Sequence, residues 1–352
     1  MKPRIVFMGT PEFAVPSLEA LIENGYEVVG VVTATDKMGG RGGKKLLESA
    51  VKKCAIKHQI PVLQPTKLRD PDFLADLRRW NTDLQIVVAF RMLPELVWDM
   101  PSLGTFNLHG SLLPKYRGAA PINWAIINGE AKTGLTTFFI KHEIDTGDML
   151  LQAETPIGPN ETAGDLHDRM MVLGADLVVD TVKLIETGSY HLQKQDDRLA
   201  CPAPKLSREV CQIDFDQSCN KVHDFIRGLS PYPAAWTRAS NQIPNTAVEN
   251  DQHSGNDSIP SLGLQDLKRG SQHSGNASTR GSTEKTNAKP SSDPANKQDD
   301  KRSESIKIFD TRPIVEDHNH PVGTLITDGK REIKIACRDG YIEVLKLQIS
   351  GR

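Results

Sequence analysis

Two short segments of the sequence place an amide, an imidazole and a carboxylate where they could act on one atom. Asn107 and His109 lie in the run FNLHG, and Asp145 lies in the run HEIDTGD. Side chains of a β-strand alternate between its two faces, so Asn107 and His109 would point in the same direction. The amide and a protonated imidazole can both donate hydrogen bonds to an oxyanion, and a carboxylate can orient the imidazole. This set of groups predicts acyl transfer without a covalent enzyme intermediate.

Each of these features also has a purely structural explanation. An Asn-x-His pair on a strand is often part of the packing, and an aspartate before Thr-Gly is commonly a turn residue. Ser111 does not add a nucleophile, because it lacks the G-x-S-x-G turn that exposes a reactive serine, and a loop-forming role is expected for it. The catalytic hypothesis therefore requires that Asn107, His109 and Asp145 meet in the folded chain.

The elements that must position these residues alternate between strand and helix. Expected strands lie at residues 4–8, 26–33, 61–63 and 86–89, and expected helices lie at 13–22, 47–58 and 70–80. Apolar strands separated by helices indicate an α/β fold with a doubly wound, mostly parallel sheet. Such sheets bind ligands beyond the carboxyl ends of their strands, so the loops after Ala89 and Leu108 are the expected site. The glycine turn at Gly9 lacks the G-x-G-x-x-G pattern, which argues against a nicotinamide dinucleotide.

The sequence after residue 190 predicts a second, smaller domain. A helical pattern at 161–186 closes a first domain of residues 1–190, and a linker follows at 191–204. The second domain would span 205–352, with a helix at 218–228 and β-rich runs at 306–309, 323–327, 332–337 and 341–347. Short strands with glycine turns predict a small β-barrel, similar to an oligonucleotide-binding (OB-like) fold.

A low-complexity segment interrupts this second domain. Residues 241–305 consist mainly of Ser, Asn, Asp, Gln, Lys and Gly, and the run QHSGN occurs in them twice. Such a composition buries too little apolar surface to offset the entropy of ordering. We therefore expect residues 241–305 to be a disordered insertion.

Length, charge and cysteine content exclude several classes of protein. A chain of 352 residues favours two domains, and a net charge of -2 argues against indiscriminate coating of nucleic acid. Its five cysteines form no C-x-x-C pair, which fits reduced thiols in the cytoplasm, and no ligand spacing typical of a metal site is present. No apolar run approaches the length of a membrane span, so no membrane association is expected.

The segments around Asn107 and Asp145 resemble those of the formyltransferase family that uses 10-formyltetrahydrofolate. The similarity is carried by the runs NLH, SLLP, RGAAPI and IDTGD. By that resemblance Asn107, His109 and Asp145 would be catalytic. The resemblance also implies a folate-binding set, made up of Ser111, Leu112, Leu113 and Pro114 along the folate and Phe90, Arg91 and Met92 at the pterin pocket. No metal is implied.

Other runs resemble the branch of this family that acts on methionyl-tRNA. They are GTPEFA at the start of the chain, GRG followed by two lysines, and KLS after the expected linker. Residues 37–53 hold six Lys or Arg against one acidic residue, Glu48. The resemblance implies that Arg41, Lys44 and Lys45 contact initiator methionyl-tRNA, whereas a solvated charged loop is the alternative.

Competing functions remain open from the sequence. A sister enzyme of the same fold could formylate an amino sugar nucleotide, or hydrolyse the formylfolate. A noncatalytic RNA-binding protein on a retired enzyme scaffold is the alternative from another class, although such a scaffold has no physical reason to keep Asn107, His109 and Asp145 together. A monomer is the default expectation for a protein whose partner is a large RNA.

Overall fold

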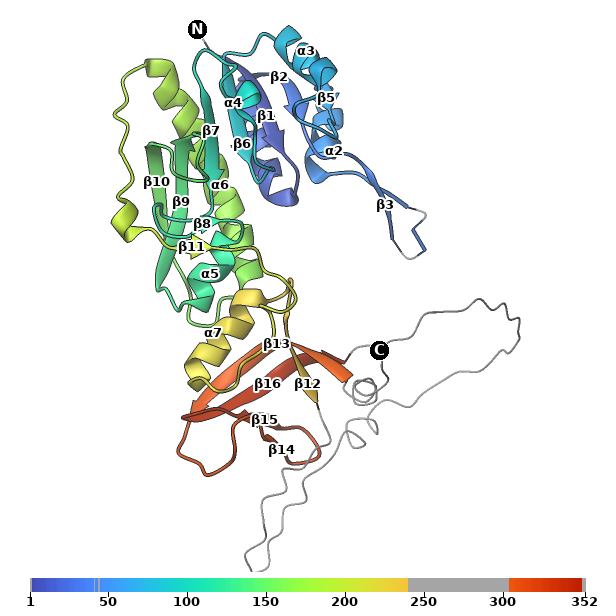
Figure 1. Ribbon diagram of the computed structural model, residues 1–352, viewed down its shortest axis with the longest axis vertical. Coiled ribbons are helices and arrows are strands. Elements are labelled where there is room, and N and C mark those ends of the chain that lie inside the picture. The colour runs from blue at the N-terminus through green and yellow to red at the C-terminus, as the bar shows by residue number, and fades with distance from the viewer. Residues whose placement is uncertain (1, 41, 44, 240–303, 350–352) are drawn as a thin grey trace, which may run out of the picture. The chain divides into compact units, whose positions relative to one another are not determined.

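The computed structural model describes residues 2–40, 42–43, 45–239 and 304–349. The chain divides into two compact units (Figure 1). Unit 1 consists of Met1–Val210 and Arg227–Pro233, and unit 2 consists of Cys211–Ile226 and Ala234–Arg352. The insertion expected at 241–305 lies outside the described residues, apart from residues 304 and 305, which begin a strand.

Unit 1 is built on a seven-stranded sheet of order β10-β9-β7-β6-β1-β2-β5 (Figure 1). The strands are β1 (Arg4–Gly9), β2 (Glu27–Val32), β5 (Val62–Leu63), β6 (Leu84–Val88), β7 (Thr105–His109), β9 (Lys132–Phe139) and β10 (Met149–Pro156). The five strands from β7 to β5 are parallel, and β9 and β10 run antiparallel at one edge. This confirms the predicted doubly wound, mostly parallel sheet, to which β10 is an addition that the sequence analysis missed.

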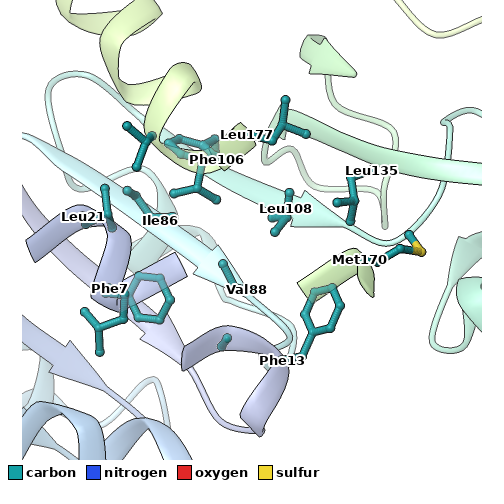
Figure 2. Close-up of a cluster of buried hydrophobic side chains, with 14 of the residues drawn as sticks. Phe7, Phe13, Leu21, Ile86, Val88, Phe106, Leu108, Leu135, Met170 and Leu177 are labelled. Atoms are coloured by element: carbon teal, nitrogen blue, oxygen red, sulfur yellow. The ribbon is translucent and has the colours of Figure 1, made fainter. Parts of the chain in front are cut away.

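Helices cover both faces of this sheet. Because side chains alternate along β1, successive residues of this strand pack against helices on opposite faces. Ile5 and Phe7 join a core with Leu18 and Leu21, which lie on a helix, and Figure 2 shows the labelled part of this cluster. Val6 and Met8 join a second core on the opposite face. The helical elements of unit 1 are η1 (Glu12–Ala14), α1 (Val15–Glu23), α2 (Ala50–Lys57), α3 (Pro71–Arg79), α4 (Glu95–Trp98), α5 (Pro121–Ile127), α6 (Ala163–Thr187) and η2 (Asp197–Leu199).

The helix expected from Leu47 begins three residues later. The Ser49 hydroxyl accepts a hydrogen bond from the Lys52 N–H and caps α2, because a serine oxygen satisfies an amide that has no partner in the first turn. The residues before it form a hairpin of β3 (Lys37–Gly39) and β4 (Lys45–Leu47), where the sequence had suggested only a mobile basic loop.

The segment 191–204, expected to be a linker, belongs to unit 1. Its strand β11 (Pro202–Ala203) pairs with β8 (Arg117–Gly118), and Gln193 exchanges two backbone hydrogen bonds with Met149. Backbone donors and acceptors form these contacts, so the polar side chains of the segment could not indicate them.

Unit 2 contains a five-stranded antiparallel sheet of order β12-β13-β16-β15-β14. Its elements are α7 (Cys219–Leu229), whose last turn belongs to unit 1, β12 (Ala235–Ala239), β13 (Glu304–Val315), β14 (Leu325–Thr327), β15 (Ile333–Ala336) and β16 (Gly340–Ile349). This antiparallel sheet corresponds to the small barrel-like domain that the sequence predicted, but among the described residues β12 and β14 do not pair, so the sheet is not closed into a barrel there. The runs expected at 306–309 and 341–347 belong to longer strands, β13 and β16. No helix in the described parts is long and apolar enough to cross a membrane.

Burial holds three of the free cysteines in their neutral form. It raises the pKa of Cys54 and Cys219 to about 11 and that of Cys337 to about 12, and nearby carboxylates add to each effect. The unfolded chain, with a thiol pKa of about 8.5, would lose these protons first. The free energy of unfolding should therefore fall as the pH rises above that value. Denaturant titrations at neutral and alkaline pH would measure it, and equal stability at both would contradict this prediction.

Candidate active site

A cavity of about 670 Å³ lies beyond the carboxyl ends of β6 and β7. It is lined by residues 89–93 after β6, by 107–110 at the end of β7 and by the loop at 140–145. These are the positions at which a doubly wound sheet binds ligands. Asn107, His109 and Asp145 all line this cavity, so the three residues singled out from the sequence meet in the fold.

His109 is almost fully buried, and one of its ring nitrogens is occupied. Its Nε2 lies 2.9 Å from the carbonyl oxygen of Tyr116. Because a carbonyl can only accept, Nε2 carries a hydrogen and donates it. Nδ1 is therefore the nitrogen that can gain or lose a proton, and it lies 3.7 Å from Asp145 Oδ2.

A backbone amide near His109 binds the Asp145 carboxylate. Oδ2 accepts a hydrogen bond from the Gly118 N–H at 2.8 Å, and only 14% of the side chain is exposed. Tyr116 and Gly118 flank Arg117, so one short segment contacts His109 through a carbonyl and Asp145 through an amide. This fixes both side chains relative to each other.

Asn107 differs from His109 and Asp145, because its side-chain amide has no hydrogen-bond partner among the described residues. It is half-buried and lines the cavity, and within the described parts of the chain its side chain makes no hydrogen bond to protein. A partly buried amide with unused donors can bind an oxygen atom of a ligand. The arrangement thus offers two donors, Asn107 Nδ2 and a protonated His109 Nδ1, beside one carboxylate.

Backbone strain also marks the cavity. Ala89 (φ 48°), Tyr116 (φ 62°) and Asp145 (φ 55°) all adopt the left-handed region that side chains other than glycine rarely occupy. Ala89 and Asp145 line the cavity, and Tyr116 holds His109. Such strain gathers at functional sites. No sequence pattern indicates this strain at Ala89 or Tyr116, because neither is a residue type that favours this conformation.

The residues expected at the pterin pocket line the cavity, but not all in the same way. Phe90, Arg91 and Met92 follow β6, and 74% of Met92 is exposed. The Arg91 guanidinium donates to the carbonyls of Pro65 and Thr66, so it braces a neighbouring turn.

Ser111, Leu112, Leu113 and Pro114 are not among the lining residues of the cavity. The buried Ser111 hydroxyl donates to the Lys115 carbonyl at 2.6 Å, as its expected loop-forming role implies, and Leu113 packs against Phe138 and Met149. Contacts within the protein thus occupy the side chains of Ser111 and Leu113. A folate contact from this run stays a prediction.

Two further histidines line the cavity that the sequence analysis did not select. His142 forms an ion pair with Glu95 at 3.2 Å when protonated, and its ring meets the edge of Trp98. His167, on α6, has its ring 5.1 Å from that of Phe13. His142 precedes Asp145 by three residues, which could have drawn attention to it. His167 had no such signal, because only the packing of α6 brings it to the site.

In the described part of the chain one group brings three potential metal ligands together. Atoms of Glu19, Cys54 and His58 lie within 4.8 Å of one another, and none of these residues lines the cavity. Glu19 pairs with Lys57 at 3.2 Å, and burial raises the pKa of Cys54 to about 11, which disfavours the thiolate that a metal needs.

We therefore expect dialysis against a chelator to leave the activity of the protein unchanged. The measurement is turnover before and after dialysis, with added zinc as the control. Activity that is lost with the chelator, restored by zinc and abolished in His58→Ala would contradict this expectation.

Of the basic residues expected to contact tRNA, only Lys45 is described, since Arg41 and Lys44 lie outside the described residues. Lys45 is exposed on the β3–β4 hairpin, beside the exposed apolar side chains Met38 and Leu46. Lys52 is not available for RNA, because it pairs with Asp36 and with Glu48.

Comparison with known proteins agrees with this geometry. Residues 3–182 match the family model described as formyl transferase, and residues 205–271 and 294–352 match that of the formyl transferase C-terminal domain. A methionyl-tRNA formyltransferase of Bacteroides thetaiotaomicron is 44% identical over 353 residues, covering 99% of this chain and 92% of that protein. The enzyme of the same name from Flavobacterium johnsoniae is 47% identical and covers 100% and 93%.

A solved structure shares the fold at much lower sequence similarity. It is the N-formyltransferase from Helicobacter canadensis in complex with folinic acid and dTDP-3-aminofucose, with a TM-score of 0.57 and 18% identity over 98% of this chain and 99% of that one. The sequence identity to these bacterial relatives extends over the whole chain, and it shows to which branch of the family the chain belongs. The chain therefore belongs to the formyltransferase family and, within it, to the methionyl-tRNA formyltransferases.

Proposed function

We propose that the protein transfers the formyl group of 10-formyltetrahydrofolate to the α-amino group of methionine esterified to initiator tRNA. The observation that carries this proposal is the meeting of Asn107, His109 and Asp145 at one cavity, in a chain similar over its full length to enzymes of that name. The lining of the cavity supports a folate donor, because the apolar side chains of Phe90, Met92 and Ile140 can contact a flat ring system.

The chemistry that these groups support is direct attack. The methionine amine must be neutral, and free α-amino groups have a pKa of about 7.7–8.0. Its lone pair attacks the formyl carbon and gives a tetrahedral oxyanion, to which Asn107 Nδ2 and protonated His109 Nδ1 would donate. Collapse breaks the bond to folate N10. The amine loses one proton and N10 gains one: protonated His109 Nδ1, beside Asp145, would give its proton to N10 and then take up the proton that the amine releases.

One assay separates this function from its rivals. The protein is incubated with 10-formyltetrahydrofolate carrying a labelled formyl carbon, and with charged initiator tRNA, an amino sugar nucleotide or no acceptor. We expect the label on the tRNA. Label on the sugar, or release as formate without an acceptor, would replace this proposal with one of the sister activities. If the donor is not consumed with any acceptor, the result would favour the other alternative, a noncatalytic RNA-binding protein on a retired enzyme scaffold.

The basic hairpin is proposed to hold the tRNA through its backbone phosphates, with Arg41, Lys44 and Lys45 as contacts. Lys45→Ala should weaken tRNA binding and reduce the slope of log affinity against log salt by about 1, the effect of one lost phosphate contact. Binding curves at several salt concentrations would measure it. Lys132→Ala is the matched control, since Lys132 is exposed and paired with Glu154. An unchanged slope in Lys45→Ala would remove Lys45 from the interface.

The protein is further proposed to act in the cytoplasm as a monomer. The folate and the initiator tRNA are its proposed partners, and no metal enters the mechanism.

A further inference from the structure

Gln195 makes four hydrogen bonds that link the catalytic loop to its neighbouring strand. Its Nε2 donates to the carbonyl of Asp145 at 2.9 Å and to that of Gly147 at 2.8 Å. Its Oε1 accepts from Nε and Nη2 of Arg117, at 3.0 and 2.8 Å. Carbonyls only accept and a guanidinium only donates, so the orientation of this amide is fixed by its partners.

The loop that Gln195 holds cannot relax without cost. Asp145 has a φ of 55°, a conformation that aspartate adopts more readily than most residues but still at a cost in energy. Gly147 is packed so closely that a Cβ atom there would lie 1.6 Å from the carbonyl oxygen of Phe139. The two carbonyls that Gln195 binds belong to Asp145 and Gly147. Its amide therefore stabilises the two residues of the loop whose backbone is most constrained.

On the other side of Gln195, the segment 116–118 contacts the side chains of both His109 and Asp145. Arg117 lies between Tyr116, whose carbonyl binds His109 Nε2, and Gly118, whose N–H binds the Asp145 carboxylate. The Arg117 side chain is largely buried and also pairs with Asp197 at 2.7 Å. Gln195 thus links two parts of the site: the backbone of the loop that contains Asp145, and the segment 116–118 that contacts the side chains of Asp145 and His109.

We infer that Gln195 is a positioning residue for formyl transfer: it sets the placement of the Asp145 carboxylate relative to His109 Nδ1 without touching the substrates. This inference rests on the proposed function. In the described part of the chain Gln195 does not line the cavity, so it would act only through the loop. The residue lies in the segment 191–204 that the sequence marks only as a linker.

The test compares two glutamines of the same segment. Gln195→Met keeps the volume of the side chain and removes its hydrogen bonds, and Gln193→Met is the control, because Gln193 is exposed and bonded only through its backbone. Displacing a catalytic group by about 1 Å can cost about 100-fold in rate, so Gln195→Met should lower kcat by about 10- to 100-fold. The KM values for donor and tRNA should stay within about twofold of wild type, because positioning affects the transition state alone.

Other roles predict different results. A purely structural role would lower the melting temperature and leave kcat at moderate temperature unchanged, and a substrate-binding role would raise KM. Either result would overturn the inference. Inactivity of the wild-type protein towards tRNA would instead count against the proposed function, so the two failures are distinguishable.

A double-mutant cycle tests whether Gln195 acts through Asp145. Asp145→Asn removes the charge and keeps a residue type that tolerates positive φ. In that background, measured with excess enzyme in a single turnover, Gln195→Met should cost less than about twofold, because residues that act as one unit are not additive. A full, additive loss would show that Gln195 acts by another route and would also overturn the inference.

Discussion

Replacing His109 by glutamine is expected to lower kcat by about 100- to 10 000-fold while the protein stays folded, which is the usual contribution of a general acid or base. The glutamine amide can still donate to the Tyr116 carbonyl, as His109 Nε2 does at 2.9 Å. It has no atom that can exchange a proton in place of Nδ1, the nitrogen that faces Asp145. The loss should therefore appear in the chemical step.

Single-turnover rates with saturating donor and charged tRNA would measure this effect, and circular dichroism would check the fold. His191→Gln is the matched control, because His191 is exposed and does not line the cavity. Turnover within about tenfold of wild type in His109→Gln would show that proton exchange at Nδ1 is not required, because that loss is below the range for general acid–base catalysis.

Replacing Asn107 by alanine is expected to lower kcat by about 100- to 1000-fold, the effect of losing one donor to an oxyanion. The folded state should hardly change, because the amide of Asn107 makes no hydrogen bond to the described parts of the protein that the substitution could break. The KM for the donor should change less than kcat, since the oxyanion forms only in the transition state.

Steady-state kinetics and a thermal melt separate these two effects. Asn24→Ala is the control, because among the described contacts the Asn24 side chain donates only to the carbonyl of Ala20, in the helix that Asn24 caps. A raised KM with an unchanged kcat in Asn107→Ala would assign the residue to ground-state binding of the folate. A loss of turnover that follows the melting temperature would assign it to the fold.

Much of unit 1 follows from local sequence patterns. Continuous apolar runs such as those of β1 and β6 are buried on both faces, and only a parallel sheet covered by helices on both sides accommodates several of them. The shared face of Asn107 and His109 follows from the two-residue repeat of a strand. The ends of the long helix α6 are also set by local sequence: a capping box at Thr162 begins it, and Gly188 in the left-handed conformation ends it.

Unit 2 shows where local patterns were not enough. Its strands were recognised from short apolar runs, but the order of the strands and whether the sheet closes depend on pairing between distant segments. β12 pairs with β13, although residues 240–303 separate the two strands in the chain. A strand pattern carries no information on which edge remains open, so it predicted the antiparallel strands of a small barrel but not the opening between β12 and β14 in the described sheet.

The sequence by itself determined that an amide and an imidazole share one face of a strand in a doubly wound sheet and that a carboxylate lies on a loop, because residue type and strand period are local properties. Only the tertiary structure decided how these groups are held. The Tyr116 carbonyl and the Gly118 N–H come from one short segment and the Gln195 amide from another, and together they contact His109 and Asp145. These contacts are made mostly by backbone atoms, which every residue type carries, so no pattern of side chains could have revealed them.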